Sequence, residues 1–326
     1  MKKPFLLFVT LAIAASSAAA TKNVDAIFAQ WNKKTGTPGC AVAVSRKGEV
    51  VLERAYGMAN LEHAVPITAT TIFEAGSVSK QVTAAAIAML AQEGKLSLDD
   101  RVRKYVPELP EYANEITIRQ MLNHTSGLRD WGTIAEISGW PRGTRAHTHL
   151  HVLQLLQQQR ALNFAPGTEW SYTNSGYNLA AIVVERVSRQ SFPDFTRERF
   201  FEPLKMTNSS WRDDYARIVP RRATAYAPDD NGRYRAEMHY ENVYGNCCLL
   251  TTVGDLLKWT DNFRTHRVGG APLLAMMEED GQLASGAKTG YGLGLTIGTF
   301  RGLREVAHSG ATGGYRSYLT RFPERD

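Results

Sequence analysis

The chain has 326 residues, of which 43% are apolar, 21% charged and 10% aromatic. This composition is that of a folded protein with a sizeable core, and it excludes a disordered or low-complexity chain. The 38 basic and 32 acidic side chains give a net charge of +6 without a clustered basic stripe, so we expect no nucleic-acid partner.

The first twenty residues predict an export signal. Lys2 and Lys3 precede an apolar run over residues 5–15, and small residues follow as far as Ala20. The run is shorter than the roughly 20 apolar residues that a spanning helix needs. We therefore expect cleavage after Ala20, a secreted or periplasmic mature protein, and no stable membrane insertion after cleavage.

The remaining chain changes character twice. Apolar residues at helical spacing over 24–31 are followed by a predicted hairpin, with strands at 40–45 and 50–56 joined at Lys47 and Gly48. Helical patterns then dominate, over residues 78–93, 116–123, 152–159, 177–188 and 252–263. Short strands return between glycine-rich turns, at 291–297, 306–308 and 315–322.

These elements predict a mixed α/β fold in which strands from both ends of the chain complete one antiparallel sheet. Residues 21–75 and 290–326 would form the sheet lobe, and a helical lobe of about 76–289 would pack beside it. Internal repeats and Pro-rich linkers are lacking in the sequence. We therefore expect a single domain over residues 21–326, of undetermined oligomeric state.

The candidate chemistry begins at Ser77, where the long predicted helix starts. Lys80 follows one turn later on the same face. A serine hydroxyl needs a neighbouring base, and a partly desolvated lysine can act as one because its pKa falls. The alternative is a serine that caps the helix beside a solvated lysine. A second Ser-x-x-Lys copy, Ser285 to Lys288, lies in a polar stretch without a following helix and is expected to be a solvated loop.

Tyr172 and Asn174 form a Tyr-x-Asn motif that also begins at Tyr112, Tyr240 and Tyr244. Only the copy at 172 lies in a Pro-Gly loop that opens a helix. Such an ordered loop can hold a phenol and an amide at the edge of a cleft. We therefore select this copy as the candidate.

Four motifs in order resemble those of the penicillin-recognising serine hydrolases. They are Gly-Ser-Val-Ser-Lys at 76–80, Leu-Asn-His-Thr-Ser-Gly-Leu at 122–128, Pro-Gly-Thr-Glu-Trp-Ser-Tyr-Thr-Asn-Ser-Gly-Tyr at 166–177 and His-Ser-Gly at 308–310. The chain is most similar to the branch of class C β-lactamases, D,D-peptidases, D-aminopeptidases and related esterases, over nearly all of residues 22–322. The resemblance implies a β-lactamase/transpeptidase-like fold, with an antiparallel sheet flanked by helices, and a serine hydrolase without metal or cofactor.

The resemblance also implies a role for each residue of the first motifs. Ser77 would be the nucleophile that forms the acyl-enzyme, and Lys80 would be its proton partner. Tyr172 would act as general base and later as acid. Asn174 would orient both the substrate and Lys80.

The third family motif, usually Lys-Thr-Gly on a strand edge, would here be His308, Ser309 and Gly310. The backbone amides of Ser77 and Ala311 would form the oxyanion hole. Residues 288–290 spell Lys-Thr-Gly literally, but they follow a flexible stretch. His308 follows a short apolar strand and precedes a Gly-Gly turn, so we favour it.

The chain departs from the family pattern in two further places. Cys247 and Cys248 stand where the family often has Gly-Gly, and adjacent cysteines can bond each other only with strain. Two alternatives remain. Either Cys247 or Cys248 forms a disulfide with Cys40, or all three cysteines are buried thiols. The chain ends at Asp326, where the family pattern continues with a strand and a helix, so we expect a C-terminally incomplete domain.

The expected substrate is a small molecule or peptide with an ester, a D-amino-acid amide or a related acyl bond. A histidine at 308 loses its charge near pH 6.5, which weakens attraction for a carboxylate and favours neutral esters and amides over β-lactams. One alternative is a β-lactamase, and another is a catalytically silent protein that binds peptidoglycan or another ligand. His147, His149 and His151 alternate without interleaved acidic residues, so we expect no metal there.

Overall fold

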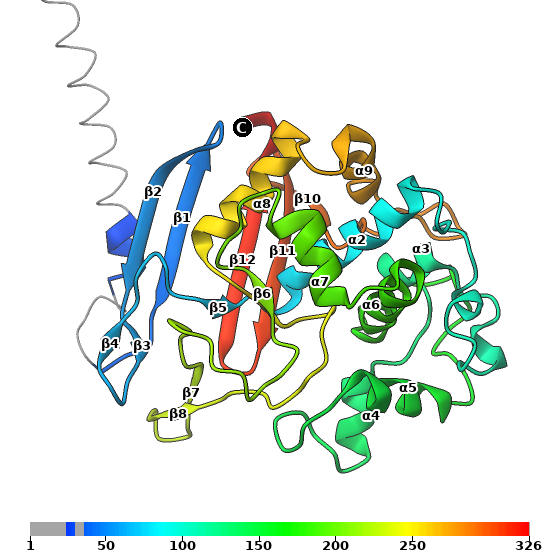
Figure 1. The fold of residues 1–326 in the computed structure, drawn as a ribbon, viewed down its shortest axis with the longest axis horizontal. Coiled ribbons are helices and arrows are strands. Elements are labelled where there is room, and N and C mark those ends of the chain that lie inside the picture. Colours follow the sequence, from blue (N-terminus) through cyan, green and yellow to red (C-terminus); the bar gives the residue numbers. More distant parts are fainter. Residues whose placement is uncertain (1–23, 30–35, 326) are drawn as a thin grey trace, which may run out of the picture.

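The computed structural model describes residues 24–29 and 36–325 (Figure 1). The predicted export signal, residues 1–20, lies outside the described residues and stays a prediction. Within these ranges, no helix has the length and apolar character that crossing a bilayer requires.

Strands from both ends of the chain lie in the same half of the molecule (Figure 1). Near the N-terminus, β1 (Cys40–Arg46) pairs antiparallel with β2 (Glu49–Tyr56). Near the C-terminus, β10 (Thr296–Phe300), β11 (Leu303–Thr312) and β12 (Tyr315–Arg321) form an antiparallel meander. The predicted fold class, a mixed α/β fold of the β-lactamase/transpeptidase type, is confirmed by the structural relatives described below.

The prediction of one continuous sheet differs from the structure. The β1–β2 hairpin and the β10–β11–β12 meander are separate hydrogen-bonded ladders. A cavity of about 590 Å³ lies between them, lined by apolar side chains that include Ala41, Leu256 and Leu319. The edges of β1 and β12 lie on either side of this cavity and do not pair.

The first hairpin turns where the sequence predicts. Lys47 and Gly48 have φ angles of 54° and 82°. Two consecutive residues with positive φ give the tight turn that matches the twist of paired strands. The glycine takes this conformation without steric cost.

The prediction of a strand over residues 291–297 is largely wrong, because β10 begins only at Thr296. Residues 290–295 form turns in which Gly290 and Gly294 have positive φ. A Cβ at Gly294 would lie 2.7 Å from the backbone oxygen of Lys80. This segment therefore packs against the start of the central helix instead of extending the sheet.

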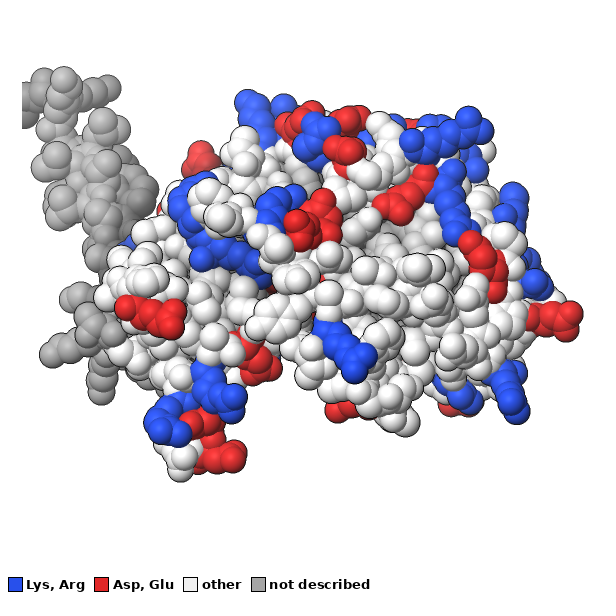
Figure 2. Space-filling view, turned by 60° about the horizontal axis from the view of Figure 1, so that its bottom comes forward, with Lys and Arg blue, Asp and Glu red and all other residues white. Residues whose placement is uncertain are grey.

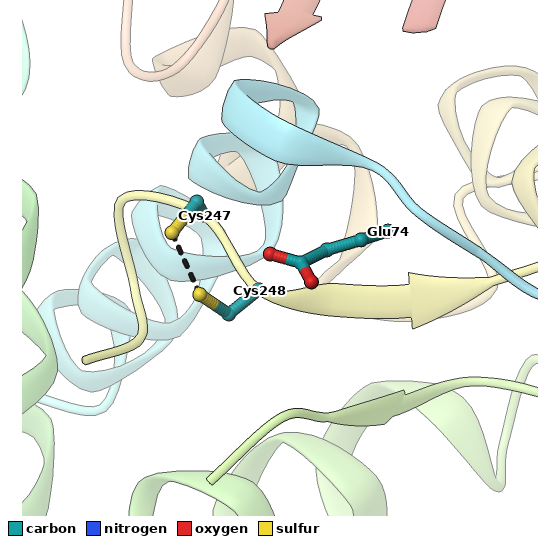
Figure 3. A group of neighbouring side chains, drawn as sticks. All are labelled: Glu74, Cys247 and Cys248. Atoms are coloured by element: carbon teal, nitrogen blue, oxygen red, sulfur yellow. Dashed lines mark hydrogen bonds between the residues drawn. The ribbon is translucent and has the colours of Figure 1, made fainter. Parts of the chain in front are cut away.

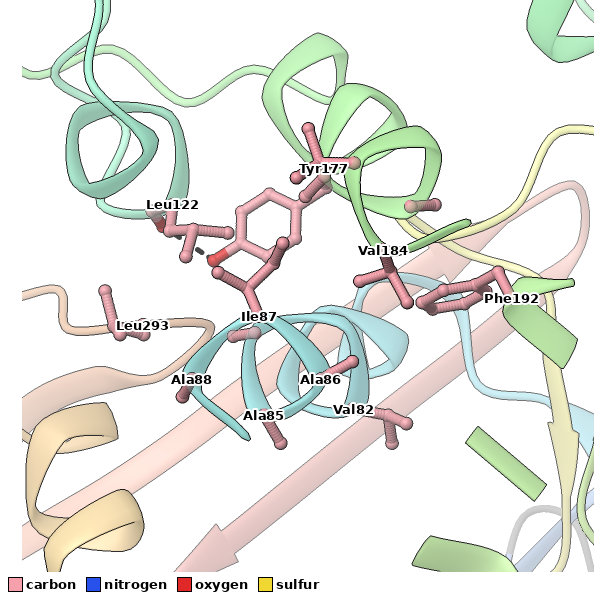
Figure 4. Close-up of a cluster of buried hydrophobic side chains, with 14 of the residues drawn as sticks. Val82, Ala85, Ala86, Ile87, Ala88, Leu122, Tyr177, Val184, Phe192 and Leu293 are labelled. Carbon is pink, nitrogen blue, oxygen red and sulfur yellow. Dashed lines mark hydrogen bonds between the residues drawn. The ribbon is translucent and has the colours of Figure 1, made fainter. Parts of the chain in front are cut away.

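The central helix, α2 (Lys80–Gln92), follows a 3₁₀ turn, η1 (Gly76–Ser79). Every side chain from 80 to 90 is buried, so the apolar surface extends all round the helix and beyond the single predicted stripe. Figure 4 shows Ile87 of α2 pointing toward Tyr177 of α6 (Ser175–Ser188), whose hydroxyl donates to the Leu122 carbonyl at 2.6 Å. Small residues let neighbouring elements approach α2 closely, which holds its first turn in place.

The other helices contact α2, cover a strand pair or, like α4 and α5, lie beyond α6 (Figure 1). They are α3 (Ile118–Leu122), α4 (Trp131–Ile137), α5 (His149–Gln157), α7 (Phe192–Thr196), α8 (Val253–Thr265) and α9 (Gly270–Met277), with the short turns η2 (Val102–Lys104), η3 (Glu111–Ala113), η4 (Arg197–Phe201) and η5 (Pro323–Arg325). The short strands are β3 (Met58–Asn60), β4 (Val65–Pro66), β5 (Phe73–Glu74), β6 (Ser210–Trp211), β7 (Tyr226–Pro228), β8 (Tyr234–Ala236) and β9 (Leu249–Thr251). Helix α8 packs on β1, so a helix of the predicted helical lobe covers the β1–β2 hairpin.

The surface charges are mixed. On the face shown in Figure 2, Lys and Arg are interspersed with Asp and Glu.

Candidate active site

A cleft of about 700 Å³ opens between η1, the loop before α6 and the strand β11. Seven of the eight predicted site residues line it, namely Ser77, Tyr172, Asn174, His308, Ser309, Gly310 and Ala311. The eighth, Lys80, is fully buried beneath the cleft and reaches Ser77 with its side chain. The structure therefore brings together residues that are more than 200 positions apart in the chain.

Lys80 Nζ has three oxygen partners. It lies 3.1 Å from Ser77 Oγ, 2.8 Å from Asn174 Oδ1 and 2.9 Å from the backbone oxygen of Asn246. The two amide oxygens can only accept hydrogen bonds. A neutral amine would use its two N–H bonds for them and keep its lone pair for the Ser77 hydroxyl.

Burial lowers the pKa of Lys80 from 10.5 to about 7, because the charged form loses its hydration. The neutral amine is therefore well populated at ordinary pH. The geometry and the pKa agree, since both allow Lys80 to take a proton from Ser77.

Tyr172 lies over this pair. Lys80 Nζ is 4.7 Å from the centre of its ring, and 38% of the residue is exposed at the cleft. Removal from water raises the pKa of the Tyr172 hydroxyl well above its ordinary value, although a hydrogen bond with Ser77 acts in the opposite direction. Tyr172 is therefore protonated at neutral pH, which suits a proton donor better than the general base that the resemblance implies.

Two glycines allow η1 to pack against β11. Gly76 has φ of 52°, and a Cβ there would lie 2.6 Å from the backbone nitrogen of Ala311. A Cβ at Gly310 would lie 2.1 Å from the Ala75 carbonyl oxygen. Only glycine fits these positions, so Ser77 and Ala311 come to the same wall of the cleft.

Comparisons with known proteins identify the family of the chain. A family model described as Beta-lactamase matches residues 24–326. The chain belongs to the β-lactamase family. D-aminopeptidases of Brucella canis and Brucella melitensis are 29% identical to it over 280 residues, which cover 86% of this chain and 53% of theirs. The chain thus spans about half the length of these curated relatives.

Solved structures show the same fold. A penicillin-binding protein homologue from Pyrococcus abyssi matches with a TM-score of 0.82 and 27% identity, over 94% of this chain and 71% of that chain. The D-amino acid amidase from Ochrobactrum anthropi SV3, complexed with D-phenylalanine, matches with a TM-score of 0.72 and 22% identity, over 92% and 88% of the two chains. The second likeness concerns the fold alone.

In this β-lactamase-family chain, His308 lies in the wall of the cleft, and each of its ring nitrogens has a hydrogen-bond partner. Nε2 is 2.8 Å from the Tyr291 hydroxyl, and Nδ1 is 2.6 Å from the backbone oxygen of Ser309. Burial, helped by the charge of Lys80, lowers the pKa of His308 to about 4. The ring is therefore neutral, and it presents no unengaged nitrogen to a substrate.

Sequence reasoning missed several residues of the cleft, including Arg142, Tyr291 and Arg316. Arg142 donates to both carboxylate oxygens of the buried Glu241. Although burial alone would raise it, the charge of Arg142 lowers the pKa of Glu241 to about 2. Arg316 is exposed, and its guanidinium donates to the carbonyls of Gly313 and Tyr315. No short motif marks these residues, so the sequence carried no signal for them.

The rejected candidates lie elsewhere in the family fold. Lys288 is exposed and donates to the Asp280 carbonyl, and Ser285 lies in the same exposed turn. His149 contacts the backbone of Tyr244, whereas His151 caps the start of its own helix. Cys40, Cys247 and Cys248 are free thiols, so the predicted alternative of a bridge to Cys40 is not formed in the structure.

Proposed function

We propose that this protein is a serine hydrolase that forms an acyl-enzyme on Ser77 and cleaves D-amino-acid amides, D-peptides or related esters. The observation that carries the proposal is the position of Lys80 Nζ, 3.1 Å from Ser77 Oγ and bonded to two amide oxygens. A buried lysine with a pKa of about 7 is the base that a serine nucleophile needs.

In the first step, Ser77 Oγ attacks the substrate carbonyl and its proton passes to Lys80 Nζ. The resulting ammonium donates to the oxygens of Asn174 and Asn246, which stabilise its charge. The backbone amides of Ser77 and Ala311 would hold the oxyanion. Tyr172, which is protonated before the reaction, would donate its proton to the leaving group and then regain one from the Lys80 ammonium.

Two observations bear on the substrate. Curated relatives that match 86% of this chain include D-aminopeptidases. Among the described residues that line the cleft, the arginines 142 and 316 are ordinarily charged at neutral pH, and carboxylates are lacking. An ammonium group on the substrate would therefore find no ion-pair partner in this lining, whereas a carboxylate would find Arg316. We propose D-peptides or D-amino-acid amides that carry a carboxylate beyond the scissile bond.

The position of Arg316 also favours a second candidate, the hydrolysis of β-lactams. Penicillins and cephalosporins carry a carboxylate beside the bond that opens. An exposed arginine in the cleft can bind such a group, although His308 is neutral.

The test is mass spectrometry of the intact protein after exposure to a fluorophosphonate and to a penicillin, combined with rates on a substrate panel. We expect the fluorophosphonate to label Ser77, and Ser77→Ala to lose both label and turnover. Ser285→Ala is the matched control, because Ser285 begins the second Ser-x-x-Lys copy and should keep both. Hydrolysis of N-acetyl-D-alanyl-D-alanine but not of its L,L counterpart would support the D-specificity.

Other outcomes would contradict the proposal. A label that maps to Ser285 or Ser309 would remove Ser77 as the nucleophile. A protein that binds penicillin without any acylation or turnover would favour the silent binding protein. A cephalosporin with a higher kcat/KM than every ester and amide tried would make β-lactam hydrolysis the function.

A further inference from the structure

Cys247 and Cys248 form a pair of touching thiols beside the catalytic lysine. Their sulfur atoms lie 2.7 Å apart, and 2% and 0% of the two residues is exposed (Figure 3). Cys248 has φ of 78°, a conformation that non-glycine residues adopt at a cost. Cys247 also lines the cleft, so it is the member of the pair that a small molecule would approach first.

Glu74 points toward the two sulfurs, and the three residues could be read as a metal site (Figure 3). The carboxylate is already engaged, because Arg212 donates to its two oxygens at 2.8 and 3.0 Å. The same guanidinium lies 3.1 Å from Cys248 Sγ. A cation at this place would face a buried positive charge, so the surroundings do not favour a metal ion.

The cysteine pair is held at both ends by the start of the catalytic helix. On one side, the backbone oxygen of Asn246 accepts from Lys80 Nζ at 2.9 Å. On the other side, the backbone nitrogen of Leu249 donates to Ser79 Oγ at 3.1 Å. Any movement of the peptide between the two cysteines is therefore transmitted to the surroundings of Lys80.

We propose that Cys247 and Cys248 are a thiol–disulfide site, at which oxidation to a disulfide between neighbours displaces Asn246 from Lys80 and slows the hydrolase. The effect on rate rests on the function proposed above, whereas the formation of the disulfide does not.

The oxidant that fits is a low-molecular-weight disulfide such as oxidised glutathione. The Cys247 sulfur, reached from the cleft, attacks one sulfur of the oxidant and releases the first free thiol. The Cys248 sulfur then attacks the mixed disulfide on Cys247 and releases the second. One sulfur–sulfur bond breaks and one forms, and the protons of the two cysteines end on the two released thiols.

The ring that results cannot form without backbone movement. Consecutive Cα atoms of a trans peptide are about 3.8 Å apart, whereas disulfides usually join Cα atoms about 4.4–6.8 Å apart. The peptide that joins the two cysteines must adjust, and the carbonyl of Asn246 lies directly before it. Strain of this kind makes a disulfide easy to reduce, as a reversible site requires.

The first measurement is peptide mass spectrometry of the folded wild-type protein in a series of glutathione buffers. Cleavage after Arg235 and Lys258 releases both cysteines in one peptide without Cys40. We expect this peptide to lose two hydrogen atoms on oxidation and to regain them with a dithiol. A peptide that keeps both hydrogens in every buffer, or that carries only bound glutathione, would overturn the proposal.

The second measurement is turnover in the same buffers. We expect oxidation to lower kcat by about tenfold, the effect of one lost hydrogen bond to a charged group, and a dithiol to restore it. Cys248→Ser should lose this response, whereas Cys40→Ser, a change of the remaining cysteine, should keep it. Should Cys248→Ser not fold, the response of wild-type and Cys40→Ser proteins still decides the question.

The two proposals fail in different ways. A protein that fluorophosphonate never labels would disprove the serine hydrolase, while the peptide masses would still report the disulfide. A disulfide that forms in a labelled, active protein without any change in kcat would overturn the coupling to Lys80.

Discussion

The Tyr291 hydroxyl and His308 Nε2 lie 2.8 Å apart, and this contact determines what His308 can do in the cleft. His308 Nδ1 carries the hydrogen, since it is 2.6 Å from the carbonyl oxygen of Ser309. Nε2 therefore accepts from Tyr291, which stabilises the neutral ring. A histidine in this state shapes the cleft wall and holds the strand edge without adding charge.

Replacing Tyr291 by phenylalanine should raise the pKa of His308 from about 4 toward its ordinary value. The hydroxyl donates to the lone pair of the neutral ring, so its removal makes protonation easier. The titration of the His308 ring signals by NMR measures this shift. Tyr318→Phe is the control, because that hydroxyl is bound to Glu305 on the exposed side of the sheet. An unchanged His308 titration in Tyr291→Phe would show that burial and the charge of Lys80 set the pKa without Tyr291.

The rate of acylation should rise with pH and reach half of its maximum near pH 7, where Lys80 loses its proton. The sign follows because the ammonium form cannot accept the Ser77 proton, so activity is lost as pH falls. His308 and His124 cannot cause this change, since burial lowers the pKa of both well below 6.5. Pre-steady-state labelling by a fluorophosphonate across the range measures the step. A rate that stays flat through neutral pH would remove Lys80 as the base.

Tyr172→Phe should fold normally and lose about 10² to 10⁴ in turnover, the usual contribution of a positioned proton donor. The stability should change little, because the ring keeps its place against His124, at 4.3 Å between centres. Tyr112→Phe is a matched control from another Tyr-x-Asn copy, since its hydroxyl donates to the Leu156 carbonyl away from the cleft. Equal turnover in wild type and Tyr172→Phe would exclude Tyr172 from the mechanism.

Arg316→Gln should weaken the hydrolysis of substrates that carry a carboxylate and spare neutral ones. A suitable pair is the acetate ester of 3-hydroxybenzoic acid and that of its methyl ester, which share the scissile bond. We expect kcat/KM for the acid to fall by about fivefold, since an exposed ion pair contributes up to about 1 kcal/mol. Arg301→Gln, a change of an exposed arginine in the β10–β11 turn, is the control. An equal loss for both esters would show that Arg316 only shapes the cleft.

Much of the site was predictable from local sequence. Ser77 and Lys80 are one turn apart, and Tyr172 and Asn174 are two residues apart, so their relative positions depend on nearby backbone. The order of the motifs led to His308 over the literal Lys-Thr-Gly at 288–290, and the structure places His308 in the cleft and Lys288 outside it. Helical periodicity likewise found α2, α3, α5, α6 and α8 to within a few residues.

The sequence by itself therefore determined the family, the candidate nucleophile with its neighbouring lysine, and the order of most helices and strands, because these depend on short spacings and on periodic burial. Only the tertiary structure decided the protonation of Lys80 and His308, which follows from burial and from partners far away in the chain. The backbone oxygen of Asn246 and the hydroxyl of Tyr291 leave no mark in a motif, since any residue has a carbonyl and many tyrosines are buried. The separation of the two strand ladders was also invisible, because apolar alternation does not say which strand edges meet.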